Sequence, residues 1–128
     1  MGKKQYEYIA VDFDGTLCEH KFPEIGEAIP AVIDFVKAHQ ERGSKIILHT
    51  CRENERREGR QYLTEALEWC ERQGLHFDAI NCNPFVPFGE RKIYADIYID
   101  DRAVNVNAIL DGVRVLGGGI IPAPPTPL

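Results

Sequence analysis

The sequence is short of cysteines, of long hydrophobic runs and of basic residues. Its 128 residues include four cysteines without a C-x-x-C pair, which excludes a zinc ribbon and favours a reducing compartment. The longest charge-free stretch, residues 115–128, holds three glycines and four prolines and cannot span a membrane. The formal net charge of −5 opposes a protein whose task is to coat nucleic acid. We therefore expect a cytoplasmic protein without a membrane segment.

The length and composition suit one folded domain. A chain of 128 residues with 44% apolar and 27% charged residues is too hydrophobic for disorder. At this size folding buries about 68% of the surface of the unfolded chain, so the core needs neither a disulfide nor a structural metal. We predict a single domain over residues 1–121 and a proline-rich C-terminal tail over residues 122–128.

Strand and helix signals alternate along the chain. Apolar runs typical of strands occur at residues 8–11, 45–49, 77–80, 96–99 and 113–116. Helical spacing occurs from Pro30 to Gly43, from Tyr62 to Gly74 and over residues 103–110, whereas the stretch before Ile29 is irregular. This order predicts an α/β fold, a three-layer Rossmann-like open parallel sheet of about five strands with helices on both faces. Such sheets bind ligands at the carboxyl ends of their strands.

The first predicted strand runs into Asp12-Phe13-Asp14-Gly15-Thr16. Two carboxylates at positions i and i+2 of a strand end can point the same way, toward one metal ion and one substrate. Gly15 lets the chain turn sharply, and the N–H groups that follow can form an anion-binding nest. The structural alternative is an Asx turn with a solvated carboxylate, which the rarity of this pattern disfavours.

Polar residues also follow two later strands. Thr50 and Arg52 come after the second predicted strand, and Asp100-Asp101 come after the fourth. Four carboxylates at one edge would repel one another at neutral pH unless a hard cation lay among them. Lys92 adds a positive charge just before the fourth strand. Carboxylates, a hydroxyl, a lysine and a divalent cation together indicate phosphoryl transfer to a carboxylate nucleophile.

These motifs resemble those of the haloacid dehalogenase superfamily of phosphatases. The matching positions are residues 12–17 for its first motif, Thr50 for the second, Lys92 for the third and Asp100-Asp101 for the fourth. The resemblance covers the chain from the first predicted strand through Arg102. It implies an enzyme, a phosphomonoester hydrolase, with Mg²⁺ as its cofactor.

The resemblance also implies a role for each matched residue. Asp12 would be the nucleophile that becomes an aspartyl phosphate, and Asp14 the general acid and later the base. Mg²⁺ would be held by the Asp12 side chain, the Asp14 carbonyl and Asp100, with Asp101 in support. The groups that would hold the substrate phosphate are Thr50, Lys92 (or Arg91 in its place) and the amides of Gly15 and Thr16. Arg52, just behind Thr50, is predicted either to contact that phosphate or to be solvated.

Superfamily members with caps carry an inserted domain, for which this chain has no room. Residues 17–29 are too few, and residues 52–91 are occupied by one predicted helix and one predicted strand. The site is therefore expected to be open. A neighbouring subunit of a homo-oligomer could cover it.

The sequences around Thr50 and Asp100 locally resemble the phosphatase domain of bacteriophage-type polynucleotide kinase–phosphatases. The substrate predicted from that resemblance is a nucleotide or a nucleic-acid 3′-phosphate. Phe85 and Phe88, in a loop with two prolines, could stack a base or pack into the core. The alternative substrate is a small phosphorylated metabolite.

Two other interpretations stay open from the residues alone. An inactive phosphate-binding module, similar to a receiver domain, also uses aspartates, a threonine and a lysine on a parallel sheet. A receiver would carry its phosphorylated aspartate after the third strand, where this chain has Ile80-Asn81. A zinc site could form if two strand ends brought together Cys18, His20, His49 and Cys51, which are otherwise buried thiols and solvated imidazoles.

Overall fold

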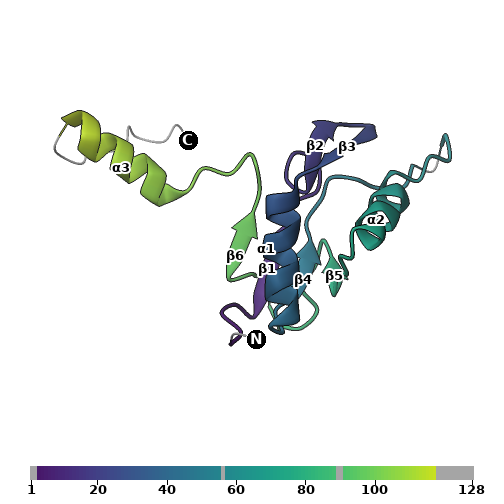
Figure 1. Ribbon diagram of the computed structural model, residues 1–128, viewed down its shortest axis with the longest axis horizontal. Coiled ribbons are helices and arrows are strands. Elements are labelled where there is room, and N and C mark those ends of the chain that lie inside the picture. Colours follow the sequence, from purple (N-terminus) through teal and green to yellow (C-terminus); the bar gives the residue numbers. More distant parts are fainter. Residues whose placement is uncertain (1–2, 56, 89–90, 118–128) are drawn as a thin grey trace.

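The computed structural model describes residues 3–55, 57–88 and 91–117. It is an α/β structure with a four-stranded parallel sheet, a two-stranded antiparallel sheet and three helices (Figure 1). The elements in chain order are β1 Tyr8–Val11, β2 Cys18–Lys21, β3 Glu24–Ala28, α1 Pro30–Glu41, β4 Lys45–Leu48, α2 Tyr62–Arg72, β5 Ala79–Ile80, β6 Ile97–Ile99 and α3 Val106–Gly117. No helix in these residues is long and apolar enough to cross a membrane.

The parallel strands lie in the order β5-β4-β1-β6, so that β1 has a neighbour on each side. Ile9 of β1 is opposite both Ile46 of β4 and Ile97 of β6. Because the strands run in one direction, β1, β4 and β6 all end at the same edge of the sheet. That edge therefore carries the polar residues that follow each of the three strands.

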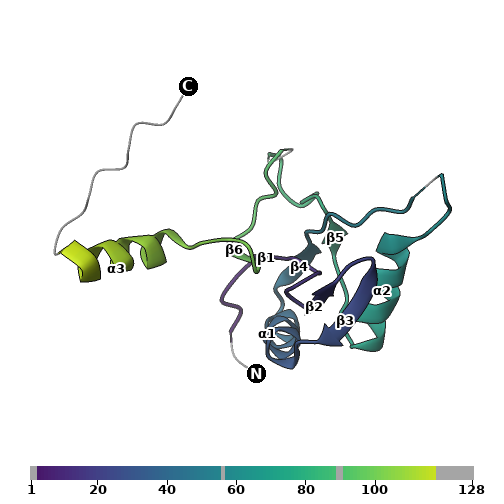
Figure 2. The same cartoon turned by 90° about the horizontal axis from the view of Figure 1, so that it is seen from above.

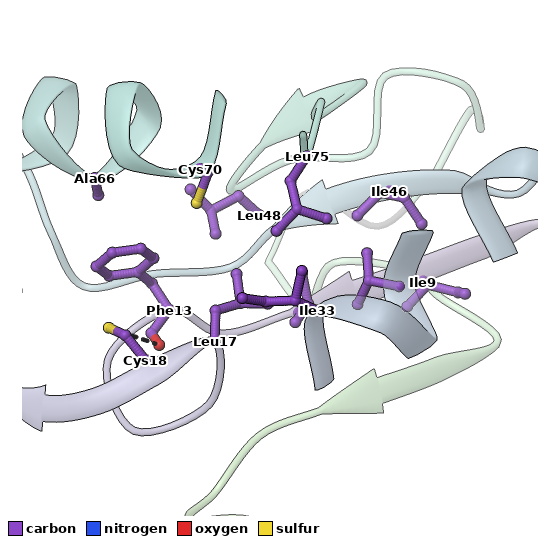
Figure 3. Packing of buried hydrophobic residues seen from close by; sticks show 12 residues of the cluster. Ile9, Phe13, Leu17, Cys18, Ile33, Ile46, Leu48, Ala66, Cys70 and Leu75 are labelled. Carbon is purple, nitrogen blue, oxygen red and sulfur yellow. Dashed lines mark hydrogen bonds between the residues drawn. The ribbon is translucent and has the colours of Figure 1, made fainter. Parts of the chain in front are cut away.

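Helices α1 and α2 pack on one face of this sheet. The apolar cluster between them combines Ile9 and Leu48 of the strands with Ile33 of α1 and Cys70 of α2 (Figure 3). Both helices match their predicted positions: α1 begins at Pro30 and α2 begins at Tyr62. Proline is tolerated at the first position of α1, because the N–H groups of the first turn have no acceptor within the helix. The first motif is attached to the same core, because Phe13 is fully buried in it.

A loop covers the opposite face of the sheet. The Tyr8 ring stacks on Phe85 with a centroid distance of 6.2 Å, and the Tyr98 hydroxyl donates to the Ile93 carbonyl. Among the described elements no helix lies on this face, since α3 extends away from the sheet (Figures 1 and 2). The Rossmann-like class thus fits, whereas the second helical layer of the prediction is not formed by the described residues.

The fifth predicted strand is wrong. Residues 113–116 belong to α3, which begins at Val106 instead of residue 103 and continues to Gly117. The apolar residues of this segment fit alternation and helical spacing equally well, so periodicity could not decide between strand and helix. The predicted tail over residues 122–128 lies outside the described residues.

The stretch predicted to be irregular contains a β-hairpin. In it Cys18 is opposite Ala28 and Lys21 is opposite Glu24. Sequence alternation could not reveal β2, because three consecutive residues, Glu19 to Lys21, are exposed. The hairpin places its tip residue Phe22 beside the edge of the parallel sheet where the strands end.

Candidate active site

Three carboxylates meet at the carboxyl edge of the parallel sheet. Each of Asp12, Asp100 and Asp101 offers an oxygen, and these three oxygens all lie within 4.8 Å of one another. The strand pairing positions them: the Asp12 N–H donates to the Ile99 carbonyl at 2.9 Å, which joins the end of β1 to the end of β6. The juxtaposition of these carboxylates agrees with the prediction from the sequence.

Gly15 lets the turn after β1 pass beside Asp101. Its φ of +85° lies in the region that L side chains rarely adopt, and a Cβ there would collide with the Asp101 carboxylate. Thr16 adds a second tie, because its hydroxyl accepts the Asp101 N–H at 3.1 Å. The glycine and threonine of the motif therefore hold the end of β6 against the end of β1.

The same turn uses the two amides that were predicted to bind phosphate. The Gly15 N–H donates to the Cys18 carbonyl at 2.8 Å, and the Thr16 N–H donates to the Phe13 carbonyl at 3.1 Å. Both bonds stabilise the turn itself. In this conformation neither amide is available to an anion.

Burial and like charges act together on Asp12. Burial is the largest cause that raises its pKa to about 6, and the carboxylates of Asp100, Asp101 and Asp14 raise it further. A hydrogen bond from the Phe13 N–H partly opposes this change. A cation held among the three oxygens would remove the repulsion. An all-oxygen donor set suits a hard ion such as Mg²⁺, so the residues present fit the predicted cofactor.

Arg52 is buried beneath the site and binds Asp14. Its Nε and Nη2 atoms donate to the two Asp14 oxygens at 2.8 and 2.9 Å, and its side chain is only 1% exposed. The remaining bonds go to the carbonyls of Glu24, at 3.0 Å, and Tyr62, at 3.3 Å. The prediction that Arg52 is solvated is therefore wrong, because its side chain is buried. The guanidinium holds the candidate acid–base residue in place.

Thr50 lies at the end of β4 with its backbone clamped by Asn81. The Asn81 side chain accepts the Thr50 N–H at 2.8 Å and donates to the Thr50 carbonyl at 2.9 Å. The Thr50 hydroxyl accepts the Arg52 N–H at 3.0 Å, so its own proton is free to point elsewhere. The clamp fixes the Thr50 backbone at the wall of a cavity that Asp12 also lines.

That cavity has a volume of about 390 Å³. Its lining includes five of the predicted residues, Asp12, Asp14, Thr50, Arg52 and Asp100. The rest of the lining consists of residues to which no catalytic role was assigned: His20, Phe22, His49, Cys51 and Arg102. The position of Arg102 directly after the Asp100-Asp101 pair could have indicated that it lies at the site. Nothing in the sequence indicated Phe22, because the hairpin that carries it was not predicted.

Lys92 lies away from this cavity. Its ammonium group is 5.1 Å from the centre of the Tyr98 ring, and neither Lys92 nor Arg91 is among the lining residues. Among the residues that line the cavity, Arg102 is the exposed cation. Phe85 and Phe88 also lie elsewhere, packed with Tyr8 and Tyr94 on the far face of the sheet.

The four residues of the zinc hypothesis do not form a site together in the described structure. Cys18 is buried and its thiol donates to the Phe13 carbonyl, as Figure 3 shows. His20, His49 and Cys51 line the cavity, but within residues 3–55, 57–88 and 91–117 only the three aspartates bring metal-binding atoms so close together.

Among the solved structures that resemble the chain, one matches almost its whole length. That structure is of a conserved protein from Bacteroides thetaiotaomicron, 37% identical in sequence with a TM-score of 0.62. The likeness covers 88% of this chain and 92% of the other, so it concerns nearly the whole fold and not one motif. No protein-family model matches the chain, and no curated protein matches it in sequence.

Removal of Arg52 should destabilise the fold strongly. Arg52→Ala leaves the Asp14 carboxylate without its partner, and we expect the free energy of unfolding to fall by about 3–5 kcal/mol in urea denaturation. Arg52→Lys should recover only part of this loss, because an ammonium group cannot form the planar fork. Arg60→Ala is the matched control: the Arg60 side chain is 33% exposed in its pairs with Glu24 and Glu65, so its loss should be much smaller. Equal losses for the two alanine variants would contradict this account of Arg52.

The raised pKa of Asp12 predicts how the stability of the metal-free protein depends on pH. A folded-state pKa of about 6, above the ordinary aspartate value of 3.8, means that the folded protein binds this proton more tightly. The resulting stabilisation is complete below about pH 4 and is lost as the pH rises through about 6. In EDTA, thermal melts of the wild type should therefore show a decrease over this range that Asp12→Asn lacks. Identical pH profiles for the two proteins would refute the assignment.

Proposed function

We propose that this chain, which belongs to the same family as the conserved Bacteroides thetaiotaomicron protein, is a Mg²⁺-dependent phosphomonoester hydrolase that acts through an aspartyl phosphate on Asp12. The observation that carries the proposal is the meeting of the Asp12, Asp100 and Asp101 carboxylates, of which Asp12 and Asp100 line the cavity. Asp14, held by Arg52, lines the same cavity. We further propose that the chain is a small capless member of the haloacid dehalogenase superfamily. Of the residues that match its motifs, the cavity is lined by Asp12, Asp14, Thr50 and Asp100.

The metal would be held by the oxygens of Asp12, Asp100 and Asp101, together with the Asp14 carbonyl that the resemblance implies. When bound, the ion would neutralise part of the negative charge of both the carboxylates and the substrate phosphoryl group. The raised pKa of Asp12 supports this role, because a cation at these oxygens would offset both the burial of the carboxylate, which is the larger cause, and the repulsion by its acidic neighbours.

In the first half of the reaction an Asp12 carboxylate oxygen attacks the phosphorus atom. The bond between phosphorus and the ester oxygen breaks, and the leaving oxygen takes a proton from Asp14. Arg52 binds both oxygens of Asp14, so proton delivery requires Asp14 to turn one oxygen away from the fork. The products of this half are the free alcohol and the aspartyl phosphate.

In the second half water attacks the phosphorus atom of the aspartyl phosphate. Asp14 takes a proton from this water, the bond between phosphorus and the Asp12 oxygen breaks, and inorganic phosphate leaves. Asp14 is then protonated and Asp12 ionised, as the next cycle requires. Arg52 favours this half, because its fork orients an Asp14 carboxylate that can accept a proton.

Two side chains in the cavity are suited to hold the phosphoryl oxygens. The Thr50 hydroxyl can donate its proton, and the exposed Arg102 guanidinium offers a charged fork. Lys92 can serve as predicted only if its ammonium group leaves the Tyr98 ring. We assign the phosphate contacts to Thr50 and Arg102, and we assign Arg52 to the positioning of Asp14.

Replacement of the nucleophile tests the covalent mechanism. Asp12→Asn removes the attacking negative oxygen, so hydrolysis of an aryl phosphate with Mg²⁺ should fall by at least about three orders of magnitude. The control is Asp34→Asn on the exposed side of α1, which should retain full activity. Beryllium fluoride should form an aspartyl-phosphate mimic in the wild type alone. Substantial turnover by a folded Asp12→Asn variant would overturn the mechanism.

Metal removal tests the cofactor. EDTA should abolish phosphatase activity, Mg²⁺ should restore it, and Ca²⁺ should inhibit because it tolerates other coordination numbers. Asp100→Asn removes one proposed oxygen ligand and should raise the Mg²⁺ concentration for half-maximal activity by about tenfold or more. Activity that survives chelation, or that only zinc restores, would refute the Mg²⁺ assignment.

A further inference from the structure

A second hollow adjoins the catalytic cavity. It has a volume of about 540 Å³ and shares Phe22, Cys51 and Arg52 with the cavity that holds the aspartates. A ligand can therefore extend from the carboxylates, past the hairpin tip, to the loop that follows β4. Both volumes fall in the range of small-molecule sites, about 300–1,000 Å³. The proposed chemistry needs only the first cavity, which leaves the second without a role.

An aromatic side chain stands between the two hollows. The Phe22 ring is 50% exposed, and the Arg52 guanidinium carbon lies 5.1 Å from its centre. Tyr62 supports the ring from α2, with centroids 5.4 Å apart and planes inclined by 40°. The ring is thus held by two neighbours, and Phe22 remains half exposed and lines both hollows. Such an exposed, supported ring can stack on a planar ligand.

The charges of the second hollow disfavour an additional phosphate. Of the described residues that line it, Glu53 and Glu55 carry carboxylates and Arg57 carries a cation, and the Arg57 N–H donates to the Glu55 carboxylate at 2.6 Å. The charge of Arg52 is already matched by Asp14. Among the described lining residues, a phosphodiester placed here would meet more negative than positive charge, whereas an uncharged ring system would meet no such penalty.

We propose that the second hollow is a leaving-group site, in which Phe22 stacks on the uncharged planar ring of a phosphomonoester. The matching substrate class is a nucleoside monophosphate, whose single phosphate lies at the aspartates and whose base lies against Phe22. This inference rests on the proposed hydrolase function and narrows its substrate. The proposed site favours mononucleotides as substrates over 3′-phosphorylated oligonucleotides, because the oligonucleotides would carry further phosphates toward Glu53 and Glu55.

Steady-state kinetics with three substrates test the inference. For the wild type with Mg²⁺, kcat/KM should be at least tenfold higher for a nucleoside 3′-monophosphate than for glycerol phosphate, which has no ring. It should also exceed that for a 3′-phosphorylated dinucleotide. Phe22→Ala should reduce the ratio of kcat/KM for the nucleotide to that for glycerol phosphate about tenfold, chiefly by raising KM for the nucleotide. Phe22→Leu should keep only part of this ratio, because leucine packs against the base without stacking on it. Phe88→Ala is the matched control, an exposed phenylalanine on the far face, and should leave all three values unchanged.

A binding measurement separates failure of the inference from failure of the proposed function. Adenosine, titrated into the Mg²⁺-loaded protein by calorimetry, should bind more weakly to Phe22→Ala than to the wild type or Phe88→Ala. If no phosphomonoester is hydrolysed but adenosine binding depends on Phe22, the hydrolase proposal fails and the ring site stands. Hydrolysis without ring preference, or a dinucleotide preferred tenfold over the mononucleotide, would overturn the leaving-group site alone.

Discussion

The buried guanidinium of Arg52 connects the parts of the molecule from which the candidate site is built. It forks onto Asp14 after β1, and it donates to the carbonyls of Glu24 in the hairpin and Tyr62 at the start of α2. An arginine can be buried at such a junction only when its N–H groups have acceptors and its charge has a partner, and both conditions are met here. The hairpin and the first motif therefore depend on one side chain that neither of them contains.

Charge repulsion is the cost of the arrangement. Parallel strands end at one edge, so the residues that follow β1 and β6 are forced together whether or not their charges agree. The raised pKa of Asp12 records this conflict between burial, like charges and the fold. Asp14 is needed as the partner of Arg52, but a protein that served only structural ends would gain from neutral side chains at Asp12, Asp100 and Asp101, because these carboxylates repel one another. The conflict is consistent with a site that binds a cation and a phosphate.

The hairpin β2–β3 forms part of the wall of the catalytic cavity. It is too small to enclose a ligand, and it contributes His20 and Phe22 to the cavity wall. Recognition at such a site depends on a few anchored side chains and on the substrate covering the rest. Phe22 is suited to this because Arg52 and Tyr62 hold it while half of its surface stays exposed.

The sequence by itself determined the parallel sheet and the acidic edge. Short apolar runs followed by Asp12, Thr50 and Asp100 sufficed, because strand direction alone brings their ends together. Periodicity failed at the hairpin, where exposed residues follow one another, and in α3, where apolar residues suit both a helix and a strand. Only the tertiary structure decided what Arg52, Lys92 and Arg102 do. A long cationic side chain can reach several partners, so its contacts depend on which elements surround it: Asp14 for Arg52, Tyr98 for Lys92 and the cavity for Arg102.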